Sequence, residues 1–165
     1  ENFEKAAEYL VLVIEAKRKI EGDYHPDLVL CYNTLGRAYE NLGNIDLTID
    51  SYKKAVEVIK KNTQGFDSDL VKVYNNIGRV YLKKEDLPKA LEYFKQAAEE
   101  GAKTSQESYE QARTHSNIAE VYVKSNDKDL AISYYEKAAK IYAQLEGPED
   151  FKVKWLEETI KTLKN

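Results

Sequence analysis

The sequence predicts an all-α protein, built as an α-solenoid of antiparallel helix hairpins. Two short blocks of residues recur three times at a nearly fixed interval. Each block lies in a segment whose apolar residues are spaced by three or four, the period of a helix with one buried face. Only two or three polar residues separate the paired segments, and such short links force antiparallel helices. Because one pair cannot bury its apolar stripe alone, neighbouring pairs must stack.

The first recurring block centres on a small residue and predicts the first helix of each hairpin. It occupies residues 32–39, 74–81 and 115–122, with Gly36, Gly78 and Ala119 as the small residue. The intervals between these small residues are 42 and 41 positions. We expect them where the two helices of a hairpin approach closely, with Tyr39, Tyr81 and Tyr122 filling the space beside them.

The second block predicts the second helix of each hairpin. It places an aromatic residue three positions before an alanine, as Tyr52 and Ala55, Phe94 and Ala97, and Tyr135 and Ala138. A short polar residue precedes each of these helices, at Asn44, Asp86 and Asp127, and is expected to be its N-cap. Thr104 and Glu107 have capping-box spacing and predict the start of the third repeat's first helix.

These patterns divide the chain into consecutive units of a single domain, 1–165. The units are 1–21 (second helix of a partial repeat), 27–62 (repeat 1), 68–102 (repeat 2), 105–145 (repeat 3) and 148–165 (a C-terminal capping helix or the start of a further repeat). Trp155, in the last unit, is expected to pack against the third repeat. The first residue is Glu1 and not Met, so we expect a fragment or a trimmed chain.

Composition limits the classes of function and partner. The 25 basic and 29 acidic residues leave a net charge of −4, which argues against general binding to nucleic acid or to anionic membranes. No apolar run approaches the ~20 residues of a membrane span, and no signal-peptide pattern is present. The single cysteine, Cys31, excludes an internal disulfide, so a reducing, cytoplasmic location is expected.

The sequence favours a non-enzymatic protein. His25 stands in a polar link, and His115 takes the large-residue position of its repeat, where packing is the simpler role. Cys31 has no histidine within a few residues. No phosphate loop, nucleophile elbow or metal-spaced cluster occurs. We therefore predict no catalytic residue, no metal ligand and no cofactor.

The repeats resemble those of the tetratricopeptide-repeat (TPR) family. That family has a large residue, then Leu-Gly, Tyr, and in the second helix Ala, an aromatic residue and Ala. The matching positions here are Tyr32, Leu35, Gly36, Tyr39, Thr48, Tyr52 and Ala55, then Tyr74, Ile77, Gly78, Tyr81, Ala90, Phe94 and Ala97, then His115, Ile118, Ala119, Tyr122, Ala131, Tyr135 and Ala138. The ~42-residue interval is similar to that of the long-repeat type found in kinesin light chains. The resemblance implies a right-handed α-solenoid, a TPR-like superhelix.

In this family the first helices line the concave face, so the resemblance implies a binding groove there. The positions assigned to that face carry six basic and two acidic residues, so the face has a charge of +4 and the rest of the chain has a charge of −8. Eleven of them are predicted to contact a ligand: Asn33, Arg37, Asn41, Lys72, Asn75, Asn76, Arg79, Lys83, Arg113, Asn117 and Lys124.

Asparagine amides can pair with the N–H and C=O groups of an extended peptide, and arginine forks suit carboxylates. The sequence therefore predicts an adaptor that binds an extended acidic peptide or C-terminal segment. The clamp for chaperone C-termini found in some family members would need Lys, Asn and Arg where this chain has Asn33, Arg37 and Asn117. The alternative function is a structural spacer or self-assembling scaffold, a homo-oligomer joined through its terminal helices.

Overall fold

The computed structural model describes residues 2–65 and 67–165, and residue 1 of the predicted unit 1–21 lies outside this range. The described residues form eight helices: α1 (Phe3–Glu21), α2 (Leu28–Asn41), α3 (Ile45–Asn62), α4 (Ser68–Lys83), α5 (Leu87–Gly101), α6 (Tyr109–Lys124), α7 (Lys128–Glu146) and α8 (Phe151–Lys164). No strand occurs among them. The predicted all-α class is therefore confirmed.

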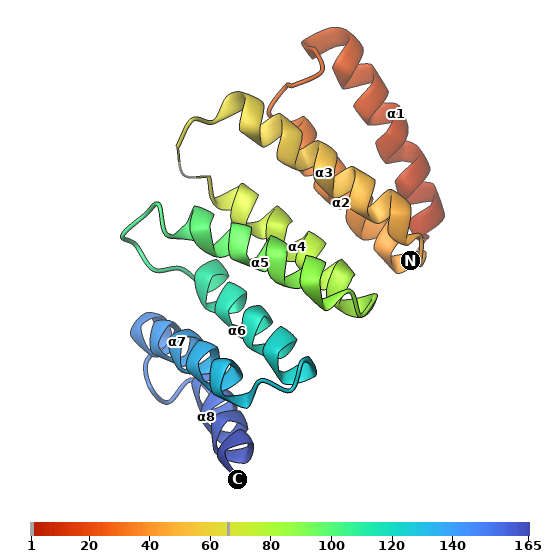
Figure 1. The fold of residues 1–165 in the computed structure, drawn as a ribbon. Coiled ribbons are helices and arrows are strands. Elements are labelled where there is room, and N and C mark those ends of the chain that lie inside the picture. The colour runs from red at the N-terminus through yellow and green to blue at the C-terminus, as the bar shows by residue number, and fades with distance from the viewer. Residues whose placement is uncertain (1, 66) are drawn as a thin grey trace.

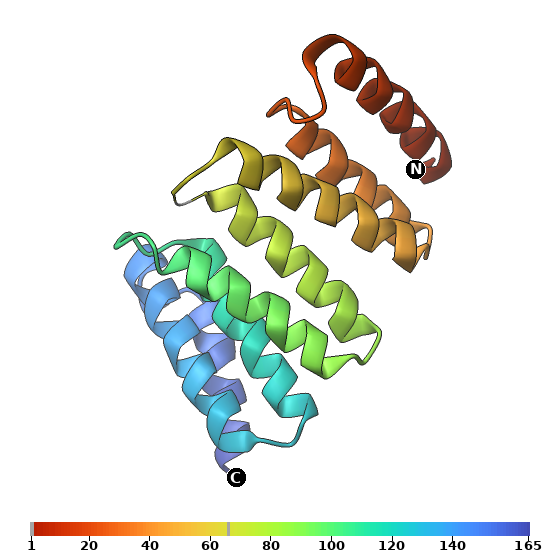
Figure 2. The same cartoon turned by 45° about the horizontal axis from the view of Figure 1, so that its top comes forward.

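The helices pack as successive antiparallel hairpins in one elongated stack, with the two termini at opposite ends (Figure 1). The pairs α2 with α3, α4 with α5, and α6 with α7 make the most extensive contacts, and consecutive pairs contact one another through α3 with α4 and α5 with α6. Figure 2 shows the same order from another angle, with α1 and α8 closing the two ends. This arrangement confirms the predicted solenoid.

The helix starts follow the sequence pattern in all three second helices. The side chains of Asn44, Asp86 and Asp127 each accept a hydrogen bond from the backbone N–H three residues later. The capping-box prediction for α6 is wrong, because its N-cap is Ser108, whose hydroxyl accepts from the Gln111 N–H. Thr104 instead caps a turn in the preceding loop by accepting from the Gln106 N–H.

The first two hairpins are each held at their centre by a glycine against an aromatic ring. A Cβ placed on Gly36 would lie 2.6 Å from a ring carbon of Tyr52, and one on Gly78 would lie 2.5 Å from the ring of Phe94. Both rings are completely buried. The backbone of the first helix therefore lies directly on the ring of the second, and no side chain fits between them.

Asparagine pairs join successive first helices. The Asn76 amide nitrogen in α4 donates to the Asn33 side-chain oxygen in α2 over 3.1 Å. The Asn117 amide in α6 donates to the Asn75 oxygen in α4 over 3.3 Å, so the same bond recurs at the next junction. Asn75 is completely buried and also donates to the Thr114 hydroxyl over 2.8 Å. These bonds satisfy polar groups that burial would otherwise leave unpaired.

We expect Gly78→Ala to destabilise the protein by about 1–3 kcal/mol, because the new methyl group overpacks against Phe94. In a Phe94→Leu background the same substitution should be neutral or stabilising by up to about 1 kcal/mol, since alanine is the better helix former. Chemical denaturation of the four proteins measures this double-mutant cycle. A stabilising Gly78→Ala in the wild-type background would contradict the close approach.

Asn75→Ala should cost about 1–3 kcal/mol of unfolding free energy, because it removes two buried side-chain hydrogen bonds. Asn41→Ala is the matched control, since Asn41 is exposed and donates only to a carbonyl of its own helix, that of Arg37. The control should change stability by less than about 0.5 kcal/mol. Equal costs, measured by urea titration, would show that the asparagine pairs do not join the repeats.

Candidate functional site

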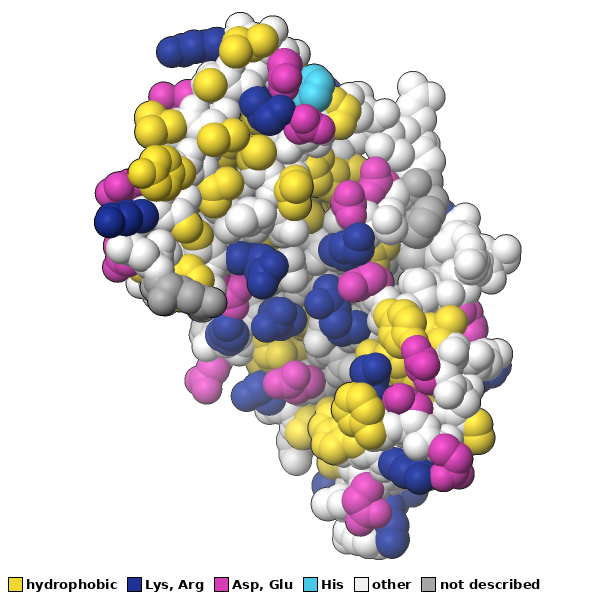
Figure 3. Space-filling view, turned by 180° about the vertical axis from the view of Figure 1, so that it is seen from behind, with side chains coloured by type: hydrophobic (Ala, Val, Ile, Leu, Met, Phe, Trp, Pro, Cys, Tyr) yellow, Lys and Arg dark blue, Asp and Glu magenta, His cyan; other side chains and the backbone are white. Residues whose placement is uncertain are grey.

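The first helices present equivalent positions on one face of the stack, where Lys and Arg side chains gather (Figure 3). Three rows of equivalent residues run across α2, α4 and α6: Leu30, Lys72 and Arg113; Arg37, Arg79 and Glu120; and Asn41, Lys83 and Lys124. The Lys83 ammonium of α4 pairs with the Glu40 carboxylate of α2. Neighbouring first helices thus bring their groove side chains into contact.

Three of the predicted cations are exposed and have no ion-pair partner among the described residues: Arg37, Arg79 and Lys124. Arg79 and Lys124 line a hollow of about 240 Å³ between α4 and α6, together with Asn117. Glu120 lies in the same hollow and offsets part of its positive charge. These groups can attract a carboxylate without first breaking an internal bond.

Three other predicted cations are paired with acidic neighbours. Lys72 lies 2.8 Å from Asp69, and Arg113 lies 2.6 Å from Glu110. The hydrogen bond with Asp69 raises the pKa of Lys72. Lys83 is paired with Glu40, as described above. A ligand carboxylate must compete with these partners, so these positions are weaker anchors than the unpaired cations.

The predicted asparagines separate into two groups. The prediction that Asn75 faces the groove is wrong, because its side chain is completely buried between α4 and α6. Asn33, Asn76 and Asn117 are half-buried, and each keeps one side-chain polar atom without a described partner. The exposed Asn41 donates to the Arg37 carbonyl over 2.8 Å.

The carboxylate of Glu40, which was not among the predicted site residues, lies beside the cations of the basic face. Glu40 accepts from the buried Tyr52 hydroxyl over 3.4 Å and pairs with Lys83. Burial and the Glu40 charge raise the pKa of Tyr52, whereas the nearby positive charges of Arg37 and Arg79 act in the opposite direction. The Glu40 side chain thus connects Tyr52, in the core of the first hairpin, to Lys83 on the basic face.

Trp155 extends the first of these rows onto α8. It follows Arg113 by 42 positions, and the N-caps of α6 and α8, Ser108 and Asp150, have the same separation. Its ring packs edge-on against Tyr135 of the third repeat, as predicted, with centroids 6.3 Å apart. The side chain is nevertheless 58% exposed. The repeat interval was the signal that could have placed Trp155 in this row.

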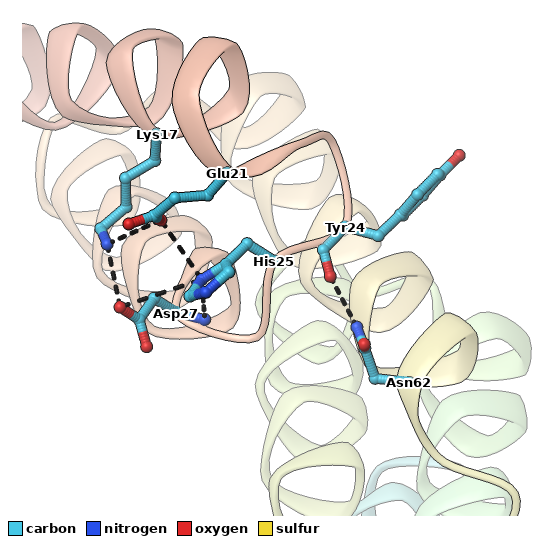
Figure 4. A network of polar contacts seen from close by, with 6 residues as sticks. All are labelled: Lys17, Glu21, Tyr24, His25, Asp27 and Asn62. Atoms are coloured by element: carbon cyan, nitrogen blue, oxygen red, sulfur yellow. Dashed lines mark hydrogen bonds and ion pairs between the residues drawn. The ribbon is translucent and has the colours of Figure 1, made fainter.

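A second cluster of polar side chains lies at the corner between α1 and α2 (Figure 4). The carboxylates of Glu21 and Asp27 and the Nδ1 atom of His25 lie close enough together to suit a metal ion. The Lys17 ammonium, however, lies 3.1 Å from Glu21 and 2.9 Å from Asp27. The Lys17 ammonium already supplies the positive charge that a metal ion would bring. The cluster is therefore an ion-pair network that joins the end of α1 to the start of α2.

The remaining candidate groups for chemistry, His115 and Cys31, are half-buried. Burial lowers the pKa of His115, which contacts the Tyr134 ring at a centroid distance of 5.9 Å. Burial raises the pKa of the Cys31 thiol and disfavours the reactive thiolate. Among the described residues, no helix is long and apolar enough to cross a membrane.

Solved structures with the same fold include repeat proteins of the kinesin light chain type. BtubC (BKLC) from P. vanneervenii superposes with a TM-score of 0.82 at 19% identity, over 99% of this chain and 66% of that chain. A Podosopora anserina putative kinesin light chain with nearly identical TPR-like repeats gives 0.80 at 18% identity, over 98% and 76%. The N-terminal domain of stress-induced protein-1 from C. elegans gives 0.67 at 21%, over 85% and 97%. This chain thus spans about two thirds of the BtubC chain.

No curated protein matches the sequence significantly. Two family models do match it, both described as tetratricopeptide repeat, at residues 30–62 and 69–144. The matched segments coincide with the helices α2 to α7 that form the three hairpins. The chain therefore belongs to the tetratricopeptide-repeat family, whose repeats generally mediate protein–protein interactions and typically form non-enzymatic scaffolds.

Proposed function

We propose that this protein is an adaptor that binds an extended acidic peptide or C-terminal segment of a partner in the groove formed by α2, α4 and α6. The observation that carries the proposal is the set of unpaired, exposed cations on that face: Arg37, Arg79 and Lys124. In a chain with a net charge of −4, this local excess of positive charge favours an acidic ligand.

The half-buried asparagines add a second kind of contact. Asn33 keeps its amide nitrogen available, while Asn76 and Asn117 keep their side-chain oxygens. Such groups can pair with the backbone N–H and C=O of an extended ligand, whatever its sequence. Because Asn76 and Asn117 are each anchored by one bond already, they lose little freedom on binding.

Self-assembly through both terminal helices has support at one end of the chain. Apolar side chains of α1 are exposed, including Tyr9 at 68% and Ile20 at 82%. In α8, however, Glu157 and Lys161 stand where the other first helices have their large and small hairpin residues. Both are exposed, as expected for a polar cap that ends the stack. A continuous array through both ends is therefore less well supported than the adaptor.

The experiment is a fluorescence titration with a labelled peptide of alternating Glu and Ser residues, and with its Gln-for-Glu version as a neutral control. We expect an acidic-peptide Kd on the order of micromolar. The variant with Arg79→Glu and Lys124→Glu should bind about tenfold more weakly or worse. Raised salt should also weaken binding, since these charges are exposed.

Lys53→Glu with Lys95→Glu is the matched control, because both lysines are exposed on second helices and the net charge changes equally. Affinity in this variant should stay within about twofold of the wild type, since these sites lie outside the groove. An equal loss in both double variants would show that net charge, and not the groove, attracts the peptide. Equal binding of the neutral peptide would exclude an electrostatic groove.

A further inference from the structure

Glu40 stands at a repeat position where the other two first helices of the hairpins carry an apolar residue. Its counterparts, 42 and 41 positions further along, are Leu82 in α4 and Val123 in α6. Leu82 is buried and forms part of the hollow between α4 and α6. The position therefore lies at the floor of the groove. Among α2, α4 and α6, only α2 places a carboxylate there.

A second difference between the repeats accompanies this carboxylate. The ring residue of α3 is Tyr52, whereas its equivalent in α5 is Phe94. The Tyr52 hydroxyl donates to Glu40 over 3.4 Å, and the Glu40 side chain is only 18% exposed. The second hairpin has an apolar pair, Leu82 and Phe94, at these two positions. The first hairpin thus holds its carboxylate in place with a hydroxyl that the second hairpin lacks.

Three cations surround the Glu40 carboxylate at the junction of α2 and α4. Lys83 of α4 pairs with it directly. Arg37 lies one turn before Glu40 on α2, and Arg79 lies one turn before Lys83 on α4. Burial and the Glu40 charge raise the pKa of Tyr52, and both arginines oppose this, so all three charges lie near its hydroxyl. Glu40 thus occupies the place that a ligand carboxylate would take at this junction.

The next junction, between α4 and α6, has a different balance of charges. Its hollow contains the exposed cations Arg79 and Lys124, and Leu82 stands where the first junction has Glu40. Glu120 also lies in this hollow, but it is exposed, so solvent screens its charge more than that of the half-buried Glu40. A ligand carboxylate therefore meets open cations at the second junction and an occupied site at the first.

We propose that Glu40 is a specificity-determining residue of the groove, which excludes a ligand carboxylate from the α2–α4 junction and directs it to the α4–α6 hollow. This inference rests on the proposed binding of acidic peptides in the groove. Packed helices lie about 8–10 Å apart, and an extended chain rises about 3.3 Å per residue. The ligand is therefore an extended peptide with an acidic residue at the hollow and an uncharged residue about three positions away, beside Glu40.

The probes are two labelled serine-based peptides of equal composition, one with two glutamates three positions apart and an isomer with the two glutamates adjacent. The wild-type protein should bind both with similar affinity, because only one junction accepts a carboxylate. Glu40→Gln keeps an acceptor for the Tyr52 hydroxyl but removes the charge. This variant should bind the spaced peptide at least about threefold more tightly than the wild type does. Its affinity for the adjacent isomer should change by less than about twofold, because adjacent glutamates cannot reach both junctions.

Glu99→Gln is the matched control, because Glu99 is exposed on α5 and the net charge changes equally. This variant should bind both peptides as the wild type does. A second variant combines Glu40→Leu with Tyr52→Phe and so reproduces the Leu82 and Phe94 pair of the second hairpin. It should show the same gain for the spaced peptide, which tests the role of the charge without relying on the Glu40→Gln protein alone.

The outcomes separate this inference from the proposed function. If the wild type prefers the spaced peptide to its Gln-for-Glu version but neither Glu40 variant gains affinity, the role of Glu40 is wrong and the acidic-peptide groove stands. Equal gains for the two isomers would also overturn the inference, because net charge would then set the affinity. If every variant binds acidic and neutral peptides equally, the proposed function fails and the inference fails with it.

Discussion

The contact of a glycine backbone with an aromatic ring at the centre of the first two hairpins is the constraint on which this structure depends. Gly36 and Gly78 leave no room for a side chain against Tyr52 and Phe94, whose rings are fully buried. This close approach fixes the distance and the register between the two helices of a pair. Because the pairs are then alike, they stack with a constant offset, and equivalent side chains form rows across the first helices.

The polar side chains of the first helices occupy two different environments. Asn75 is buried between α4 and α6, where its bonds to Thr114 and Asn117 join the repeats. Asn76, one residue later, lies at the edge of the groove and is anchored by Asn33. Adjacent residues of one helix thus differ: the Asn75 side chain is enclosed by packing, and Asn76 keeps its side-chain oxygen free for the proposed ligand. The recurrence of the same asparagine bond at two junctions makes it part of the repeat unit.

The two ends of the stack differ in chemistry. At the C-terminal end, α8 buries Val153 and Leu156 against the last hairpin and turns Glu157 and Lys161 to solvent. Lys152 lies over the rings of Tyr109 and Tyr142, which ties α8 to α6 and α7. At the N-terminal end, α1 exposes the apolar side chains of Tyr9, Val13 and Ile20. The two terminal helices thus expose residues of different character, charged in α8 and apolar in α1.

The sequence by itself determined the fold, the register and the helix starts of the second helices, because these depend on local rules. Apolar residues at helical spacing, small residues at a fixed interval, and Asn44, Asp86 and Asp127 as caps act within one turn or one hairpin. The repeat interval of 41 or 42 residues also predicted that the basic residues of the first helices lie on one face. Local rules were not sufficient at α6, where the N-cap is Ser108 and not Thr104. Both residue types can cap a helix, so the sequence alone does not distinguish between them.

Only the tertiary structure decided which polar side chains remain free. Asn75 and Asn76 are identical in type and adjacent in sequence, yet only Asn75 is fully buried, because its side chain lies in the contact between α4 and α6. Likewise, Lys83 and Lys124 occupy equivalent positions, but only Lys83 has Glu40 of the preceding helix within reach. Exposure and pairing depend on residues some 40 positions away, and the distances to such neighbours are set by packing.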